Sequence, residues 1–268
     1  MIPKLTLDGK RETEKIKSFL EKEVRERGFT KVMIACSGGI DSTVVAYLCV
    51  KALGKTNVCP LLLPFGNLSN EETIDAQLAL GFLSIPQEHI VTIDIKRMVE
   101  SFTTSLRIGD KKIDNVRMGN IMARARMICL YDQAKKRKAL VVGTENKSEH
   151  LLGYYTRFGD EASDIEVIRH LYKTQVIQLA AYLGVPKKII IKPPTANLWL
   201  GQTDEGQFGF SYAQADPILW GLYDKKMSME ELVRHGIKKE LIEKVKLWIK
   251  ANSFKREVPI VFSPSKDR

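Results

Sequence analysis

The fold is decided by the stretch Lys31–Ser42, which reads K-V-M-I-A-C-S-G-G-I-D-S. Its first six residues, Lys31–Cys36, are mostly apolar and predict a buried strand. The apolar run Thr43–Leu53 that follows predicts a helix. Between them, Ser37–Ser42 combines glycines that let the backbone approach an anion with serine hydroxyls and the free N–H groups of a helix start. The stretch therefore predicts a strand–turn–helix phosphate cradle.

Three further short runs have the character of strands. They are Asn57–Leu63, His89–Ile95 and Ala139–Val142, each bounded by glycine, proline or polar residues, with helical segments between them. Strands that alternate with helices indicate βαβ crossovers, which are built around parallel sheets. We expect an α/β fold: a doubly wound parallel sheet with helices on both faces. Its ligands should bind beyond the carboxyl ends of the strands.

The rest of the chain predicts helices and one irregular segment. Residues 16–24 carry apolar side chains at helical spacing, and helical patterns recur at Lys173–Leu183, Ser228–His235 and Lys238–Ile249. Residues 197–211 mix glycines with polar residues and show no sustained periodicity, which suits an active-site loop. We expect one domain with four parts: an N-terminal helix (1–28), an α/β core (29–196), a mobile active-site loop (197–211) and a helical C-terminal extension (212–268).

Composition narrows the class of protein. The 268 residues carry a formal charge of +10, which favours polyanionic ligands, either nucleic acids or phosphate-rich small molecules. The basic run at 135–138 closes a predicted helix, where cations complement the macrodipole, and this favours small molecules over nucleic acid. The four cysteines form no C-x-x-C pair, and no apolar run approaches the roughly 20 residues that span a bilayer. We expect a cytoplasmic protein without a membrane partner.

The cradle resembles the signature of a known enzyme group. S-G-G-x-D-S at a strand-to-helix turn resembles the motif of the ATP pyrophosphatases, which cleave ATP between its α and β phosphates; it is not a Walker A loop, which requires G-x-x-x-x-G-K-[ST]. Asp41 also has a simpler interpretation, because a carboxylate at a helix start is favoured by the dipole. The resemblance implies the adenine nucleotide alpha-hydrolase-like fold and a magnesium cofactor.

Later motifs narrow the resemblance to the NAD synthetase family. Gly143–Glu149 resembles the family's G-T-x-x-x-x-E segment, and Asn120–Met127 resembles its N-x-x-A-R-x-R-M helix. The likeness continues through Gly153–Asp164 and spans most of the chain from Val32 to Pro259. By itself, a carboxylate such as Glu149 is equally typical of a solvated surface. Arg124 could likewise lie on a solvated helix face or cover apolar surface with its stem.

The resemblance implies roles for individual residues. The positions that match ATP-binding residues are Ser37, Gly38, Gly39, Ile40, Asp41, Ser42, Thr144, Lys173 and Thr195. Asp41 and Glu149 match magnesium ligands, a pair that suits a cation which commonly takes one or two protein carboxylates. Lys173 and Asp41 are the expected catalytic residues. The positions that match deamido-NAD-binding residues are Arg124, Arg157, Asp164, Phe254 and Lys255.

Two of these positions depart from the family pattern. Many members have lysine where Arg157 stands, which keeps the charge and changes the geometry. Phe254 replaces the histidine of an H-K-R pattern, so that a ring available for stacking takes the place of a hydrogen-bonding side chain.

The implied reaction is the ATP-dependent amidation of deamido-NAD. The substrates are ATP, deamido-NAD and ammonia, because the chain has no room for the glutaminase domain of glutamine-dependent relatives, and Cys36 lies in a predicted strand. The family also implies a homodimer, to which the apolar faces of the first helix and of Ile121–Leu130 could contribute. Two alternatives remain. A tRNA-modifying pyrophosphatase explains only the first motif, and a non-enzymatic nucleotide-binding module would not need both Asp41 and Glu149.

Overall fold

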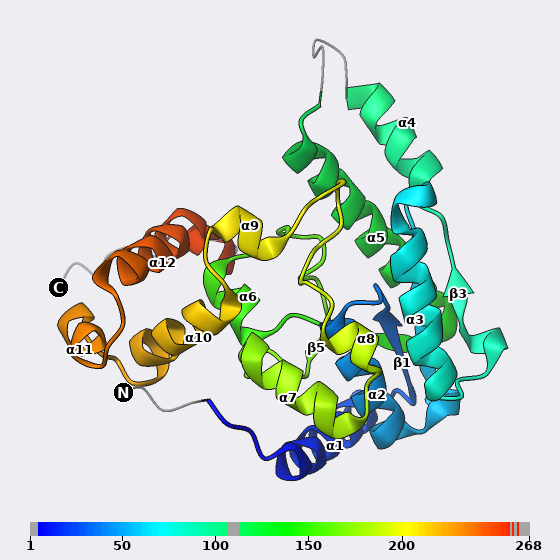
Figure 1. Ribbon diagram of the computed structural model, residues 1–268. Helices are drawn as coiled ribbons and strands as arrows, with labels where there is room; N and C mark the ends of the chain where they lie inside the picture. Colours follow the sequence, from blue (N-terminus) through cyan, green and yellow to red (C-terminus); the bar gives the residue numbers. More distant parts are fainter. Residues whose placement is uncertain (1–4, 107–112, 258, 260–261, 263–268) are drawn as a thin grey trace.

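The computed structural model describes residues 5–106, 113–257, 259 and 262, and within them five strands form one parallel sheet (Figure 1). The strands are β1 (Lys31–Ala35), β2 (Val58–Leu62), β3 (Val91–Thr92), β4 (Ala139–Gly143) and β5 (Ile165–Glu166). Their order is β3-β2-β1-β4-β5. Strands β2 and β4 are buried along their whole length, as expected for strands covered on both faces. The predicted parallel sheet and its first four strands are confirmed.

The fifth strand was not predicted. β5 has two residues, which is too short for any periodic pattern, and it pairs with the end of β4 through the register Val142↔Ile165. This strand directly follows the segment 153–164, which was interpreted through its resemblance to binding motifs and not for its secondary structure.

Helices cover both faces of the sheet. On one face lie α1 (Gly9–Glu26), α2 (Ile40–Leu53) and α7 (Lys173–Leu183), which contact one another; on the other lie α5 (Asn115–Arg137) and, outside it, α4 (Lys96–Leu106). The side chains of β1 alternate accordingly: Val32 and Ile34 join the first core, and Met33 joins the second. Helix α3 (Asn70–Phe82) packs beside α2 at the sheet edge. The doubly wound arrangement is therefore as predicted.

The apolar stripe of the N-terminal helix packs against the rest of the same chain. Ile16, Leu20 and Val24 are at most 3% exposed and pack in the core beside α2 and α7. The side chain of Asp8 caps the helix by accepting a hydrogen bond from the Arg11 amide. This face is consequently not available for a dimer contact, and that part of the sequence expectation is wrong.

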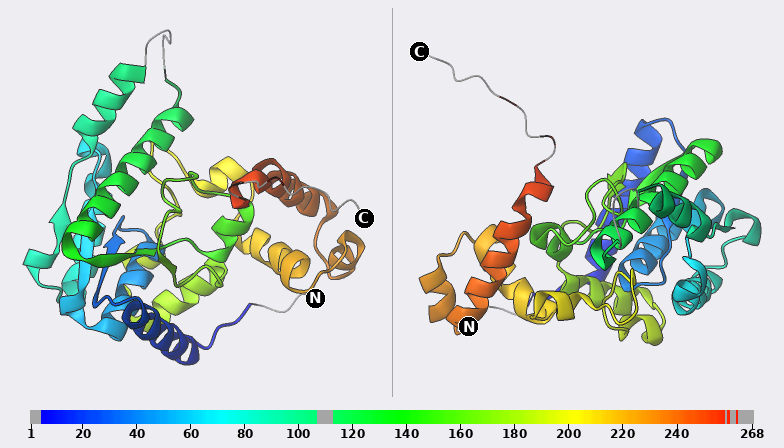
Figure 2. Two further views of the ribbon diagram at one scale, coloured as in Figure 1. Left: turned by 180° about the vertical axis from the view of Figure 1, so that it is seen from behind. Right: turned by 90° about the horizontal axis from the view of Figure 1, so that it is seen from above.

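The C-terminal extension forms a separate helical layer beside the sheet, with its own apolar core (Figure 2). It contains α10 (Tyr212–Leu219), a π-helical turn (Trp220–Asp224), α11 (Met229–Arg234) and α12 (Lys239–Asn252), and it packs on α6 (Lys147–Leu152) and α7. The two predicted helices are confirmed as α11 and α12. Helix α10 was missed, because Pro217 lies inside it and proline normally argues against a helix interior.

The segment 197–211 is more structured than predicted. It contains the short helix α9 (Asp204–Phe208), which begins at a Thr203 cap whose side chain accepts from the Gly206 amide. Gln202, Asp204 and Phe208 are buried. A glycine-rich sequence can therefore be anchored by a few buried side chains, which composition does not reveal.

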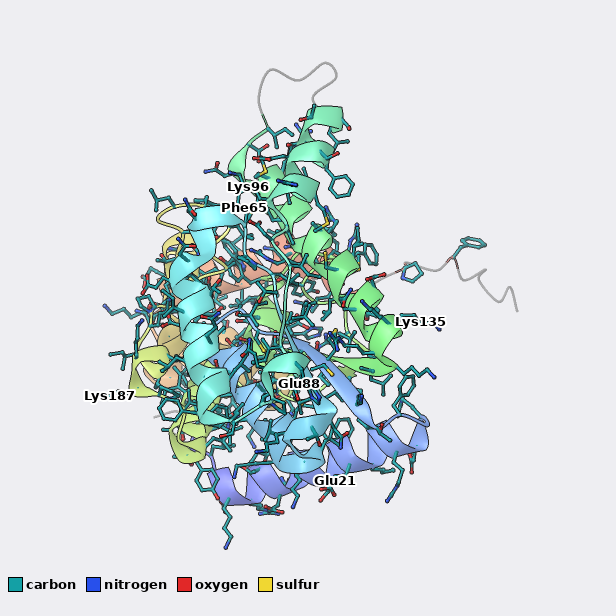
Figure 3. The ribbon with its side chains drawn as sticks, turned by 90° about the vertical axis from the view of Figure 1, so that its right-hand side faces the viewer. Glu21, Phe65, Glu88, Lys96, Lys135 and Lys187 are labelled. Carbon is teal, nitrogen blue, oxygen red and sulfur yellow. The ribbon has the colours of Figure 1, made fainter. Side chains whose placement is uncertain are left out.

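The remaining short elements connect these layers. The 3₁₀ turns are Lys55–Asn57, Gly66–Ser69, Gln87–His89 and Ser253–Arg256, and the apolar run at Ile189–Ile191 largely lies in the single-turn helix α8 (Lys187–Ile190). Lys135, in the last turn of α5, points outward at the side of the molecule, so the basic run closes a helix as predicted (Figure 3). Among the described residues, no helix is long and apolar enough to cross a membrane.

Candidate active site

The predicted cradle forms a compact turn between β1 and α2. Helix α2 begins at Ile40 with Gly39 as its N-cap. The Ser37 hydroxyl accepts from the Gly39 amide at 3.3 Å and lies 3.1 Å from the Ser42 hydroxyl, while Thr43 Oγ1 donates to the Gly39 carbonyl at 2.9 Å. These hydroxyl contacts hold the turn in shape at the start of a helix, where an anion is favoured.

Gly38 is required by its surroundings as well as by its conformation. Its φ is +78°, a value that residues with a side chain rarely adopt. A Cβ built on Gly38 would lie 2.2 Å from the carbonyl oxygen of Glu72 in α3. The cradle therefore packs against the backbone of α3 with no room for a methyl group.

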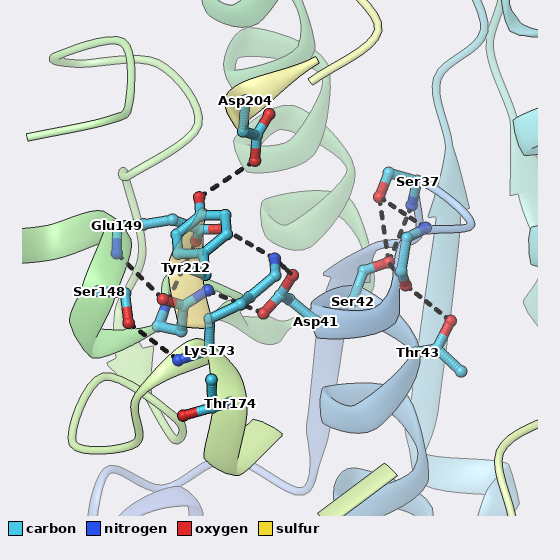
Figure 4. A network of polar contacts seen from close by, with 12 residues as sticks. Ser37, Asp41, Ser42, Thr43, Ser148, Glu149, Lys173, Thr174, Asp204 and Tyr212 are labelled. Carbon is cyan, nitrogen blue, oxygen red and sulfur yellow. Dashed lines mark hydrogen bonds and ion pairs between the residues drawn. The ribbon is translucent and has the colours of Figure 1, made fainter. Parts of the chain in front are cut away.

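Lys173 is the centre of the site. It is the first residue of α7, its side chain is 5% exposed, and its Nζ lies 2.5 Å from Asp41 Oδ2 and 3.1 Å from Glu149 Oε1 (Figure 4). Asn146, at the start of α6, connects the two acids: its Nδ2 donates to Asp41 Oδ1 at 2.9 Å and its Oδ1 accepts from the Glu149 amide at 3.0 Å. Three helices, α2, α6 and α7, thus bring one cation and two carboxylates together.

A third carboxylate and a tyrosine complete this cluster. Asp204 in α9 is 3% exposed and accepts a hydrogen bond from Tyr212 OH at 3.1 Å, and the Tyr212 ring lies 5.2 Å from Lys173 Nζ. Burial lowers the pKa of Lys173, but the charges of Asp41, Glu149 and Asp204 outweigh burial and raise it overall. Lys173 is therefore a fixed cation at neutral pH and is unsuited to act as a base.

The charge balance of the cluster fits a divalent cation. Burial raises the pKa of Glu149 to about 8, although the charge of Lys173 acts in the opposite direction. One lysine faces several carboxylates, so added positive charge would stabilise the ionised acids. The described residues contain no group of three or more metal-ligating side chains. Magnesium accepts one or two carboxylates and completes its shell with phosphate oxygens and water, so Asp41 and Glu149 fit it.

A cavity of about 280 Å³ joins the cradle to this cluster at the carboxyl ends of the strands. The predicted ATP-binding residues that line it are Ser37, Gly39, Ile40, Asp41, Ser42, Thr144, Lys173 and Thr195, together with Glu149. Gly38 is the one exception, since it faces α3. Thr195 Oγ1 donates to the Gln202 carbonyl at 2.7 Å, so its hydroxyl is already engaged within its own loop.

Four of the five residues predicted for the dinucleotide form a second cluster. Arg124 Nη2 donates to the Arg157 carbonyl at 3.1 Å. The Arg157 guanidinium lies 5.3 Å from the ring of Phe254 and the same distance from that of Phe158. Lys255 Nζ donates to the carbonyls of Gly153 (2.7 Å) and Tyr155 (3.1 Å). Within the described residues, none of these three cations has a carboxylate ion pair, so the cluster is a candidate anion site.

The fifth residue, Asp164, lies elsewhere in the fold. Its side chain is engaged at the sheet, where Oδ2 accepts a hydrogen bond from the Val141 amide at 2.8 Å. The structure therefore gives Asp164 a position beside β4 and does not join it to the Arg157 cluster.

Sequence analysis missed several residues that line the cavity. It singled out Arg124, but in α5 it is Arg126, two residues further on, that lines the cavity, with Nε donating to the Leu63 carbonyl at 3.1 Å. Burial lowers the pKa of Arg126. Asp204 and Tyr154 also line the cavity. Asp204 was missed because residues 197–211 were interpreted as a loop, and Tyr154 because residues 153–164 were used only as a family motif. The available signal for α9 was Thr203, a typical N-cap residue, followed by two acidic residues in the first turn.

A buried acid anchors the loop that leads to Thr195. Asp75 in α3 is fully buried, and its two oxygens lie 2.7 Å from Lys188 Nζ and 2.8 Å from Lys192 Nζ. Burial raises the pKa of Asp75, but the two lysines outweigh it and lower the pKa overall. Glu72 also pairs with Lys192 at 3.2 Å, so α3 holds both the cradle and the opposite wall of the cavity.

This is an α/β nucleotide-binding protein with a site for a nucleotide's phosphate groups. The features that define it are the parallel sheet, the cradle after β1 and the lysine–carboxylate cluster at the strand ends. Comparison with known proteins is more specific. A model of the NAD synthase family matches residues 12–259, and the chain belongs to this family.

Individual relatives agree over nearly the whole chain. An NH3-dependent NAD(+) synthetase of Thermococcus kodakarensis is 44% identical over 95% of this chain and 97% of its own. Among solved structures, an NH3-dependent NAD synthetase from Campylobacter jejuni has a TM-score of 0.79 at 32% identity, covering 96% of this chain and 100% of its own. An NMN synthetase from Francisella tularensis has a TM-score of 0.82 at 32% identity, covering 97% and 100%.

Proposed function

We propose that this protein is an ammonia-dependent NAD synthetase, which adenylates the nicotinate carboxylate of deamido-NAD with ATP and then forms the amide, releasing pyrophosphate and AMP. The observation that carries the proposal is the position of Lys173 between Asp41 and Glu149, in a cavity that also contains the cradle. Family membership supports the same reaction, because relatives of this length and identity carry that name.

The chain contributes mainly positioning and charge to the first step. The Ser37–Ser42 cradle holds the ATP phosphates at the start of α2, and Lys173, kept protonated by its carboxylates, offsets charge on the phosphate oxygens as the nicotinate oxygen attacks the α phosphorus. Asp41 and Glu149 would hold magnesium, which stabilises the charge on departing pyrophosphate. No covalent enzyme intermediate is required.

The Arg157 cluster is suited to the second substrate. Arg124, Arg157 and Lys255 have no carboxylate ion pair among the described residues, and the phosphates of a dinucleotide bind such positive groups. Phe254 supports the guanidinium of Arg157 by stacking, which a histidine at this position would do less well. The two departures from the family pattern therefore contact each other and are best understood as one unit. Asp164 instead accepts a hydrogen bond from the Val141 amide in β4, and we propose a structural role there without direct contact with the ligand.

Free ammonia is the proposed nitrogen donor. Burial raises the pKa of Cys36 to about 12, so this thiol, although it lines the cavity, is not a nucleophile that could release ammonia from glutamine. Ammonia would attack the adenylated carboxyl carbon, and AMP would leave as the amide forms. The relatives named above as NH3-dependent support this assignment.

We further propose that the protein acts as a homodimer through the outer surfaces of α4 and α5. Phe102 and Leu106 in α4 and Val116 and Ile128 in α5 are between 44% and 59% exposed. Exposed apolar side chains on neighbouring helices are typical of a contact surface. Light scattering of the wild type and of Ile128→Glu tests this: the variant should shift toward monomer.

The experiment that tests the function measures AMP and NAD formed from ATP, magnesium, deamido-NAD and ammonium. Parallel reactions replace ammonium with glutamine, or deamido-NAD with the deamido form of NMN, the substrate class suggested by the Francisella relative. We expect NAD with ammonium alone. Turnover of the mononucleotide but not the dinucleotide would overturn the substrate assignment.

A matched pair of variants tests the role of Lys173. Lys173→Met should abolish NAD formation, whereas Lys147→Met should retain it. Both lysines are the first residue of a helix and pair with an aspartate, but Lys147 pairs with Asp224 outside the cavity. Equal loss of activity in the two variants would contradict the assignment.

A further inference from the structure

One buried acid lies next to the site without lining the cavity. Asp216, in α10 of the C-terminal extension, is fully buried in the core formed by the extension with α6 and α7. Burial raises the pKa of its carboxyl group, while hydrogen bonds from Ser148 and Thr174 act in the opposite direction. Burying a carboxylate in an apolar core destabilises the folded state, and a hydrophobic residue of similar size would avoid this desolvation penalty. The contacts of Asp216 therefore need an explanation.

Those contacts lead to the first turn of α7. Asp216 Oδ2 accepts from the Thr174 amide at 2.9 Å, and Oδ1 accepts from the Ser148 hydroxyl at 2.6 Å. The same hydroxyl accepts from the Lys173 amide at 2.9 Å. The first amides of a helix lack partners within it, and the N-cap of α7 is Tyr172, whose side chain makes no capping bond. Asp216 and Ser148 therefore cap α7 from two other helices.

This cap determines where both charged groups of the site lie. Lys173 is the first residue of α7, and Ser148 precedes Glu149 in α6, so the hydrogen bonds through Ser148 join the backbones that carry the central cation and one of its carboxylates. Four residues before Asp216 on the same face of α10, Tyr212 places its ring 5.2 Å from Lys173 Nζ. Helix α10 thus contacts the ammonium end of Lys173 through Tyr212, and it reaches the Lys173 amide indirectly, through the Ser148 hydroxyl.

We propose that Asp216 is a positioning residue, which fixes Lys173 and Glu149 relative to each other through Ser148 and the Thr174 amide, and makes the C-terminal extension part of the active site. The proposal rests on the proposed function for its kinetic consequence. The hydrogen bonds and the burial of Asp216 are independent of any ligand, so the cap is testable separately.

The test uses Asp216→Asn and Ser148→Ala, with Asp224→Asn as the matched control. Asp224 also joins α6 and α7 to the extension, through Lys147 Nζ (2.5 Å) and Tyr172 OH (3.1 Å), but it does not reach the amides of α7. The measurements are kcat and KM for ATP, amide hydrogen exchange at Lys173 and Thr174, and thermal unfolding. Ser148→Ala leaves the carboxylate and its Thr174 bond in place, so it remains informative if Asp216→Asn does not fold.

We expect amide exchange at the start of α7 to accelerate about tenfold in both variants, as for the loss of a helix cap. The kcat should fall about tenfold or more, because a small displacement of a charged group is sufficient for that loss, with KM for ATP changed by less than about threefold. Asp224→Asn should keep kcat and exchange within about twofold. An unchanged kcat in Ser148→Ala, or an equal loss in Asp224→Asn, would overturn the proposal. If the wild type forms no NAD, the proposed function fails, and exchange still decides the cap.

Discussion

Replacing Gly38 by alanine should damage the protein far more than replacing Gly28, although the two glycines share a conformation. Their φ values are +78° and +77°, so alanine costs each about 1 kcal/mol of backbone strain. At Gly28 the new methyl group meets nothing within 4 Å, whereas at Gly38 it would lie 2.2 Å from the Glu72 carbonyl oxygen and 3.1 Å from the Ala76 amide nitrogen. Both of these atoms are backbone and cannot rotate away.

The additional cost at Gly38 follows from that contact. To reach an ordinary separation, the cradle and α3 must move apart by more than 1 Å, which opens a well-packed region; overpacking of this kind costs about 1–3 kcal/mol beyond the strain. We expect Gly38→Ala to lose about 2–4 kcal/mol of unfolding free energy and Gly28→Ala about 1 kcal/mol. Because the cradle moves, ATP binding should also weaken in Gly38→Ala.

Urea unfolding and ATP titration of both variants measure these effects. Gly28→Ala controls for the conformational cost and should bind ATP as the wild type does. Equal destabilisation of the two variants, with unchanged ATP affinity in both, would refute the argument that packing against α3 selects glycine in the cradle.

Three further changes have defined outcomes. Burial raises the pKa of Glu166 to about 7, so the folded protein loses stability as the pH rises from about 4.5 to 7. Glu166→Gln should remove this dependence. The unfolding free energy of the variant minus that of the wild type should therefore increase by up to about 3 kcal/mol between pH 5 and pH 8. If urea unfolding gives the same difference at both pH values, the argument is wrong. Phe254→Leu removes the ring beneath the guanidinium and should raise KM for deamido-NAD about three- to thirtyfold, with KM for ATP unchanged; steady-state kinetics with each substrate varied checks both. Asp75→Asn deprives two lysines of their buried partner and should cost about 2 kcal/mol in urea unfolding at pH 7, a difference that should disappear in acid as the wild-type carboxylate protonates.

The glutamate at position 149 shows what a motif can indicate that composition cannot. A lone carboxylate after a strand is equally typical of a solvent-exposed surface position. Only the spacing of Glu149 from Thr144 distinguished it from such a surface residue. In the structure it lies 3.1 Å from Lys173, as part of the cluster that the resemblance implied. The same reasoning selected Arg124 over Arg126. In the structure Arg124 donates a hydrogen bond to the Arg157 carbonyl, whereas Arg126 lines the cavity. A helix turns about 100° per residue, so side chains two apart face different surroundings.

Local sequence patterns were sufficient to predict the parallel sheet with four of its five strands, the cradle and the family. Continuous apolar runs mark strands buried on both faces, and glycines and serines at a strand-to-helix turn mark a phosphate site. Which side chains share an environment became visible in the three-dimensional packing alone. Asp204, Tyr212 and Asp216 are distant in sequence from the first turn of α7, and they lie close to it because α9 and α10 return there. Contacts of this kind depend on packing between helices, and one chain's periodicity carries no record of them.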